Sequence, residues 1–183
     1  METQTRNKGN ILIVDDKPAN LRLLSDMLTE EGHKVRSVVN GQMALTAAHA
    51  APPDLILLDI SMPGMDGYQL CATLKDDEDL ADIPVIFISA LDETQGKVKA
   101  FGSGGVDYIT KPFHIEEVLA RVETHLALRN LQRELEYEIA ARDKLIAELN
   151  AFAHTVAHDL KNPLAVLVSY ASMLELRYDQ LPN

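Results

Sequence analysis

Short apolar runs alternate with amphipathic segments over the first 125 or so residues of the chain. The runs lie at residues 11–14, 34–38, 54–59, 84–89 and 106–109 and have the length of strands in a sheet. Between them, apolar residues recur every three or four positions, which is the spacing of a helix that buries one side. This alternation predicts an α/β fold with a five-stranded parallel sheet and helices on both of its faces.

Polar residues stand at or just beyond the carboxyl ends of four of these strands. Asp15 and Asp16 follow the first run, Asp59 ends the third, Ser89 ends the fourth and Lys111 follows the fifth. Ligands of open parallel sheets bind beyond the carboxyl ends of the strands. We therefore expect these five residues, which are far apart in the sequence, to meet at one edge of the sheet.

Three carboxylates held together repel one another unless a cation joins them. Mg²⁺ or Mn²⁺ would supply that charge through oxygen ligands, and the ammonium of Lys111 would add to it. One strand-end aspartate alone would more simply cap the following helix. All five polar residues together favour a phosphoryl-transfer site, in which one aspartate is the nucleophile while a metal and a lysine hold the phosphoryl oxygens.

Residues 10 to about 128 resemble the receiver domain of response regulators. The resemblance implies a flavodoxin-like fold, with residues 10–125 as the domain and residues 1–9 as a tail. It also implies that Asp59 is the phosphoacceptor. Four segments carry the resemblance: Ile-Val-Asp15-Asp16, Leu-Leu-Asp59-Ile-Ser-Met-Pro-Gly-Met-Asp-Gly, Ile-Ser89-Ala and Asp-Tyr108-Ile-Thr-Lys111-Pro112-Phe.

The same resemblance implies a set of metal ligands. Asp16 and Asp59 would bind Mg²⁺ through their side chains. Asp15 would help through water, and Ser61 would contribute its backbone carbonyl. The segment Ser61-Met62 lies where the family varies and tunes dephosphorylation, so the lifetime of the phosphoryl group is left open.

The resemblance further implies how phosphorylation is read. Lys111 would pair with the phosphoryl group, and the bond between Lys111 and Pro112 would be cis, as is common in the family. Ser89 and Tyr108 would form the switch. The serine hydroxyl would move towards the phosphate while the tyrosine ring turns inward.

Beyond Phe113 the pattern becomes that of one uninterrupted helix. Apolar residues recur at alternating spacings of three and four, with one extra shift near Leu135 and one polar member, Arg142. This pattern predicts a coiled coil over residues 126–150 and a parallel homodimer through a helix of residues 115–178, about 95 Å long. The repeated positions are Leu128, Leu131, Leu135, Ile139, Arg142, Ile146, Leu149, Ala153, Val156 and Leu160.

Two histidines lie on this helix. His158 points about 180° and His154 about 140° away from the apolar stripe, so both are expected to be exposed. The segment from His158, His-Asp-Leu-Lys-Asn-Pro-Leu, resembles the H-box of histidine kinases. By that resemblance His158 is a phosphoacceptor, Asp159 is its acid/base partner and Asn162 assists phosphatase activity, while His154 is ordinary polar surface.

The second resemblance assigns residues 151–183 to the first helix of a kinase dimerisation domain. It implies that the chain is the front of a histidine kinase, regulated by the receiver and requiring ATP through a catalytic domain that this sequence does not contain. Alone it should not hydrolyse ATP. Partners would be an upstream histidine phosphodonor or a downstream receiver protein. Two alternatives stay open: a non-catalytic dimerisation adaptor, and a relay between His158 and Asp59.

Composition limits the kinds of binding partner and the cellular compartment that are expected. A net charge of −11 over 183 residues argues against nucleic acid, because phosphate contacts need clustered Lys and Arg. Cys71 is the single cysteine and cannot form an internal disulfide, and its place in a predicted helix indicates a buried apolar side chain. No signal peptide and no membrane span are evident, so a cytoplasmic protein is expected.

Overall fold

The computed structural model describes residues 8–90 and 102–178, except the side chains of residues 162, 172 and 174–178. The helix predicted near residues 94–101 lies outside these residues. Contacts along the chain divide it into two units, residues 1–132 and residues 133–183, which are described separately.

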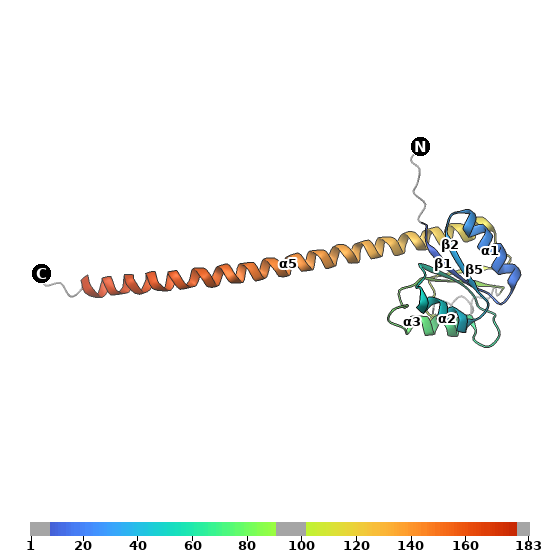
Figure 1. Cartoon of the computed structure of the whole chain (residues 1–183), viewed down its shortest axis with the longest axis horizontal. Coiled ribbons are helices and arrows are strands. Elements are labelled where there is room, and N and C mark those ends of the chain that lie inside the picture. Colours follow the sequence, from blue (N-terminus) through green and yellow to red (C-terminus); the bar gives the residue numbers. More distant parts are fainter. Residues whose placement is uncertain (1–7, 91–101, 179–183) are drawn as a thin grey trace, which may run out of the picture. The chain divides into compact units, whose positions relative to one another are not determined.

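The first unit contains a five-stranded sheet in which all neighbouring strands are parallel (Figure 1). The strand order is β2-β1-β3-β4-β5, so β3 is the central strand and lies between β1 and β4. This arrangement confirms the predicted flavodoxin-like α/β fold. The strands are β1 (Asn10–Val14), β2 (Lys34–Val38), β3 (Leu55–Asp59), β4 (Val85–Ser89) and β5 (Asp107–Thr110).

Local sequence signals start the helices that connect these strands. Pro18 occupies the first turn of α1, where its missing N–H costs no hydrogen bond. The Asn40 side chain accepts a hydrogen bond from the Met43 N–H at 2.8 Å, and Asp66 and Gln69 form a reciprocal capping box. The helices are α1 (Pro18–Glu30), α2 (Gly41–Ala50), α3 (Gly67–Lys75) and α5 (Ile115–Tyr178).

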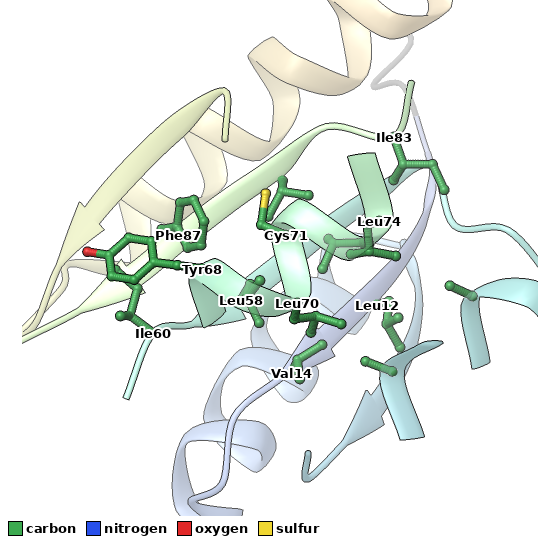
Figure 2. Packing of buried hydrophobic residues seen from close by; sticks show 14 of the residues in the cluster. Leu12, Val14, Leu58, Ile60, Tyr68, Leu70, Cys71, Leu74, Ile83 and Phe87 are labelled. Atoms are coloured by element: carbon green, nitrogen blue, oxygen red, sulfur yellow. The ribbon is translucent and has the colours of Figure 1, made fainter. Parts of the chain in front are cut away.

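Two apolar cores lie on opposite faces of the sheet because successive strand residues point to opposite sides. On β1, Leu12 and Val14 belong to the core that contains α2 and α3, whereas Ile11 and Ile13 belong to the core that contains α1 and the start of α5. Figure 2 shows the first core, where the Tyr68 and Phe87 rings lie with centroids 5.4 Å apart. The two cores fix the central strands, and thereby their carboxyl ends.

Cys71 lies fully buried in the α2/α3 core. Burial raises the pKa of its thiol, so it stays protonated near neutral pH. This confirms the prediction of a buried apolar side chain.

Helix α5 begins as part of the first unit and extends far beyond it in sequence. Val118, Val122 and Leu126 are buried in the core on the α1 side of the sheet. The helix then continues to Tyr178 and includes Pro163, as the sequence predicted. Within the residues that the structure describes, no helix is both long and apolar enough to cross a membrane.

Candidate functional site

The ammonium of Lys111 lies between two carboxylates at the carboxyl ends of β1 and β3. Its Nζ donates to Asp15 Oδ2 and to Asp59 Oδ1, both at 2.9 Å. The carboxylates come from strands that neighbour each other in the sheet, and Lys111 follows β5. The predicted convergence of residues separated by 52 and 96 positions is therefore present.

Asp15, Asp16 and Asp59 form a cluster of three carboxylates. Oxygens of all three lie within 4.8 Å of one another, and the residues are at least half buried. Asp16 Oδ1 is a buried oxygen with no hydrogen-bond partner in the described part of the chain. A buried acceptor without a partner destabilises the folded state unless a ligand or metal ion binds it. The cluster therefore fits a hard divalent cation, for which oxygen ligands are preferred.

The β3–α3 loop is built tightly around Asp59. Gly67 begins α3, and its N–H donates to the Ile60 carbonyl at 3.0 Å. A Cβ at residue 67 would lie 2.5 Å from the Asp59 carbonyl oxygen, so only glycine fits there. Ser61 is exposed in the same loop, two residues after Asp59.

Electrostatics at this edge are set by burial and by Lys111. Burial raises the pKa of Asp59 above its ordinary value, and the hydrogen bond and charge of Lys111 oppose this rise without cancelling it. Burial alone would lower the pKa of Lys111, but its bonds to Asp59 and Asp15 outweigh that effect and raise it. Lys111 therefore remains charged, and Asp59 is a destabilised carboxylate that gains from an added cation.

The two residues predicted to form the switch lie on the neighbouring strands β4 and β5. Ser89 is fully buried and Tyr108 is 6% exposed. The Lys111 N–H donates to the Ser89 carbonyl at 2.7 Å, which connects the end of β4 to the lysine. The peptide bond between Lys111 and Pro112 is cis, as the resemblance implied.

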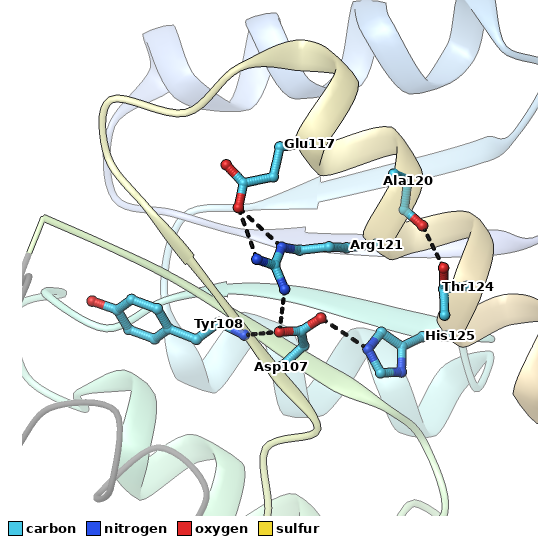
Figure 3. Close-up of polar contacts among 7 residues, drawn as sticks. All are labelled: Asp107, Tyr108, Glu117, Ala120, Arg121, Thr124 and His125. Atoms are coloured by element: carbon cyan, nitrogen blue, oxygen red, sulfur yellow. Dashed lines mark hydrogen bonds and ion pairs between the residues drawn. The ribbon is translucent and has the colours of Figure 1, made fainter. Parts of the chain in front are cut away.

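A polar network between β5 and α5 was not foreseen from the sequence (Figure 3). Asp107 Oδ1 accepts from Arg121 Nη1 at 2.6 Å and from the Tyr108 N–H at 2.7 Å, while Oδ2 lies 3.1 Å from His125 Nε2. Arg121 also donates to Glu117. Burial would raise the pKa of Asp107, but these hydrogen bonds outweigh it and lower the pKa. The strand that carries Tyr108 is thus fastened to α5.

One signal could have revealed this network. Asp107 is a charged residue in an otherwise apolar strand, and Glu117, Arg121 and His125 are spaced by four on one side of α5. Asn20 was also missed. Its Nδ2 donates to Asp15 Oδ2 at 2.7 Å.

Helix α5 carries the predicted apolar stripe and the two predicted histidines. Large stripe residues are exposed, for example Leu149 at 65% and Leu160 at 56%. His158 is exposed too, and its Nδ1 lies 3.3 Å from Asp159 Oδ1. The His158 and Asp159 side chains are brought together, while the Asn162 side chain is outside the described residues.

A parallel α/β domain that gathers three aspartates and a lysine at the carboxyl ends of its strands is a receiver of two-component signal transduction. The response regulator receiver domain family matches residues 11–123, and the chain belongs to that family.

Two curated relatives and one solved structure illustrate the similarity. The chain is 46% identical over 116 residues to the DNA-binding dual master transcriptional regulator RpaA of Synechocystis sp., covering 63% of this chain and 48% of RpaA. It is 35% identical over 139 residues to the transcriptional regulatory protein KdpE of Mycobacterium tuberculosis, covering 76% of this chain and 60% of KdpE. A crystal structure of the signal receiver domain of a signal transduction histidine kinase from Syntrophus aciditrophicus is 39% identical with a TM-score of 0.62, covering 65% of this chain and 90% of that one.

The chain thus spans about half of RpaA and somewhat more of KdpE. The expectation that it is part of a protein histidine kinase, an enzyme transferring phosphate from ATP to histidine, is wrong. The matched curated relatives are regulators, and the family match ends at residue 123, before the H-box-like segment. Seven residues on one helix fix no tertiary site, whereas the receiver assignment rests on residues that converge from the carboxyl ends of four strands.

Proposed function

We propose that this chain receives a phosphoryl group on Asp59 with the help of Mg²⁺. The observation that carries the proposal is the Lys111 ammonium, 2.9 Å from both Asp15 and Asp59. These two carboxylates cluster with Asp16, whose Oδ1 has no hydrogen-bond partner among the described residues. Asp16 and Asp59 would hold the metal directly, Asp15 would act through water, and Ser61 would contribute its carbonyl. The metal would neutralise charge on the phosphoryl oxygens when bound. The donor would be a phosphorylated histidine of a partner protein.

The chain's own residues would divide the remaining work. Asp59 is the nucleophile, because it is the position that matches the family's phosphoacceptor and because it is buried and bonded to Lys111. Lys111 moves its hydrogen bond from Asp59 to a phosphoryl oxygen, and the Ser89 hydroxyl donates to another. Tyr108 follows by turning its ring inward. Through Asp107 and Arg121, a change at β5 reaches the first turns of α5.

Binding of Mg²⁺ and beryllofluoride, a phosphoryl analogue, tests this site. We expect Mg²⁺ alone to raise the melting temperature of the chain and beryllofluoride with Mg²⁺ to raise it further. Asp16→Asn should weaken Mg²⁺ binding by about tenfold or more, because it replaces a charged ligand. Isothermal titration calorimetry measures the affinity, and Asp79→Asn, in an exposed turn, is the control. Equal Mg²⁺ affinities of the wild type and Asp16→Asn would contradict the assignment.

We also propose that α5 forms a parallel homodimer through its apolar stripe. Contiguous exposed apolar surface of this extent marks an interaction site in a soluble protein. The stripe repeats every 3.5 residues on average, which suits a second identical helix. A receiver at the start of each helix could then alter how the pair is wound.

A second candidate function is a phosphotransfer role for His158. The 3.3 Å contact between His158 Nδ1 and Asp159 Oδ1 favours it, because a carboxylate there can take a proton from the imidazole. Asn162 would assist hydrolysis of the phosphoryl group. The role needs only a relay with Asp59 or with another receiver, and no ATP-binding domain.

His158→Gln tests this relay against His154→Gln, the matched control four residues earlier on the same helix. After incubation with a labelled small-molecule phosphodonor, we expect the wild type to carry two kinds of label: an alkali-labile part on aspartate and an alkali-stable, acid-labile part on histidine. His158→Gln should lose only the alkali-stable, acid-labile part. His154→Gln should retain both. Alkali-stable, acid-labile label that survives in His158→Gln would exclude His158 as its acceptor.

A further inference from the structure

Asn20 lies in the first turn of α1 and reaches back to the end of β1. Pro18 opens the helix, and Lys17 precedes it at the cap position. The Asn20 amide Nδ2 donates to Asp15 Oδ2 at 2.7 Å, and this oxygen also accepts from Lys111 at 2.9 Å. The resemblance to receiver domains, which gives roles to the three aspartates, gives none to Asn20.

The hydrogen bonds of Asp15 can be counted. Its Oδ1 accepts from the Lys17 N–H at 2.8 Å, so together with Asn20 and Lys111 it accepts three hydrogen bonds. A carboxylate offers about four lone-pair positions. Asp15 is only 1% exposed, so water contributes little to its remaining capacity.

Asp16 presents the opposite situation within the same cluster. Its Oδ1 is buried and has no hydrogen-bond partner among the described residues. A cation entering the cluster thus finds one carboxylate with a spare oxygen and another that is largely occupied. This difference favours direct ligation by Asp16 over direct ligation by Asp15.

We propose that Asn20 is a positioning residue that holds Asp15 out of direct contact with the metal and thereby limits the affinity for the divalent ion. The inference rests on the proposed Mg²⁺ site. Without the Asn20 amide, Asp15 Oδ2 would keep only Lys111, and its negative charge would be less neutralised. A divalent cation would compensate that charge, so the metal-bound form would gain relative to the metal-free form.

Calorimetric titration with MgCl₂ alone tests this role. We expect Asn20→Ala to bind Mg²⁺ about tenfold more tightly than the wild type, the size expected for one hydrogen bond to a charged group. Arg22→Ala, an exposed position on the next part of α1, should leave the affinity unchanged. Alanine favours helix, and circular dichroism checks that both variants fold.

A double-mutant cycle shows whether Asn20 acts through Asp15. In an Asp15→Asn background, Asn20→Ala should no longer change the Mg²⁺ affinity, whereas a general effect on α1 would persist. Normal binding by the wild type with unchanged or weaker binding by Asn20→Ala would overturn the role of Asn20 alone. A wild type that binds no Mg²⁺ would overturn the proposed metal site, and the role of Asn20 with it.

Discussion

Asp59→Asn should abolish labelling of the receiver by a small-molecule phosphodonor. The amide is nearly isosteric but is not a nucleophile, so we expect the rate of stable receiver labelling to fall by more than about 1,000-fold. No other carboxylate in the cluster combines the position of Asp59 with its contact to Lys111 and a glycine-lined loop around it. Alkali-labile label, measured over time with excess donor, reports this rate.

Asp26→Asn provides the matched control, because it makes the same change at an exposed position of α1. It should label at the wild-type rate. If Asp59→Asn labelled as fast as this control, Asp59 could not be the acceptor.

The free energy of unfolding shows whether Asp59→Asn has lost only its nucleophile or also its fold. The pKa of Asp59 is raised by burial, so its ionisation destabilises the metal-free folded state relative to the unfolded state. This penalty is absent below the unfolded value near 3.8 and develops as the pH rises through the folded pKa. Asp59→Asn should therefore be more stable than the wild type at neutral pH without metal, because the amide cannot ionise in the buried site. Urea denaturation at pH 7 and at pH 3 measures the difference, which should shrink at the lower pH.

The strand ends were predictable because the parallel sheet imposes their convergence. Five apolar runs fixed the strands, and the residues at their carboxyl ends had no freedom to lie elsewhere. Hence Asp15, Asp59 and Lys111 were placed correctly from the sequence alone. Ser89 was placed at the end of its strand in the same way, whereas Tyr108 was named only through the resemblance to receiver domains.

Side-chain contacts between neighbouring helices and strands were harder to predict from the sequence. Asn20 looks like any polar residue near a helix start, and its contact with Asp15 depends on how α1 leaves β1. Asp107 and Arg121 are 14 residues apart and meet only because α5 packs beside β5. The histidine-kinase assignment drawn from the H-box-like segment failed for a different reason. The segment specifies residues on one helix, and residues on one helix fix no tertiary site.

Disrupting the stripe of α5 should convert a dimer into a monomer. We choose Ile146→Lys with Leu149→Lys, because these residues are adjacent positions of the stripe and are 49% and 65% exposed on the single chain. In a parallel homodimer the two substitutions change four side chains, and each buried Leu or Ile contributes about 2–5 kcal/mol. The lysines would also lie opposite one another and repel. We expect the dimer dissociation constant to rise by more than about 1,000-fold, which corresponds to about 4 kcal/mol.

Sedimentation equilibrium over a range of concentrations measures this constant. Ala147→Lys with Ala151→Lys is the matched control, since it adds the same two charges to α5 at positions away from the stripe. The control should stay dimeric, because its lysines face solvent in a two-stranded coil. Equal weakening by both pairs would show that net charge rather than the stripe governs association. A wild type that is monomeric at all concentrations would remove the dimer from the proposed function, while leaving the site around Asp59 unaffected because that site lies within one receiver.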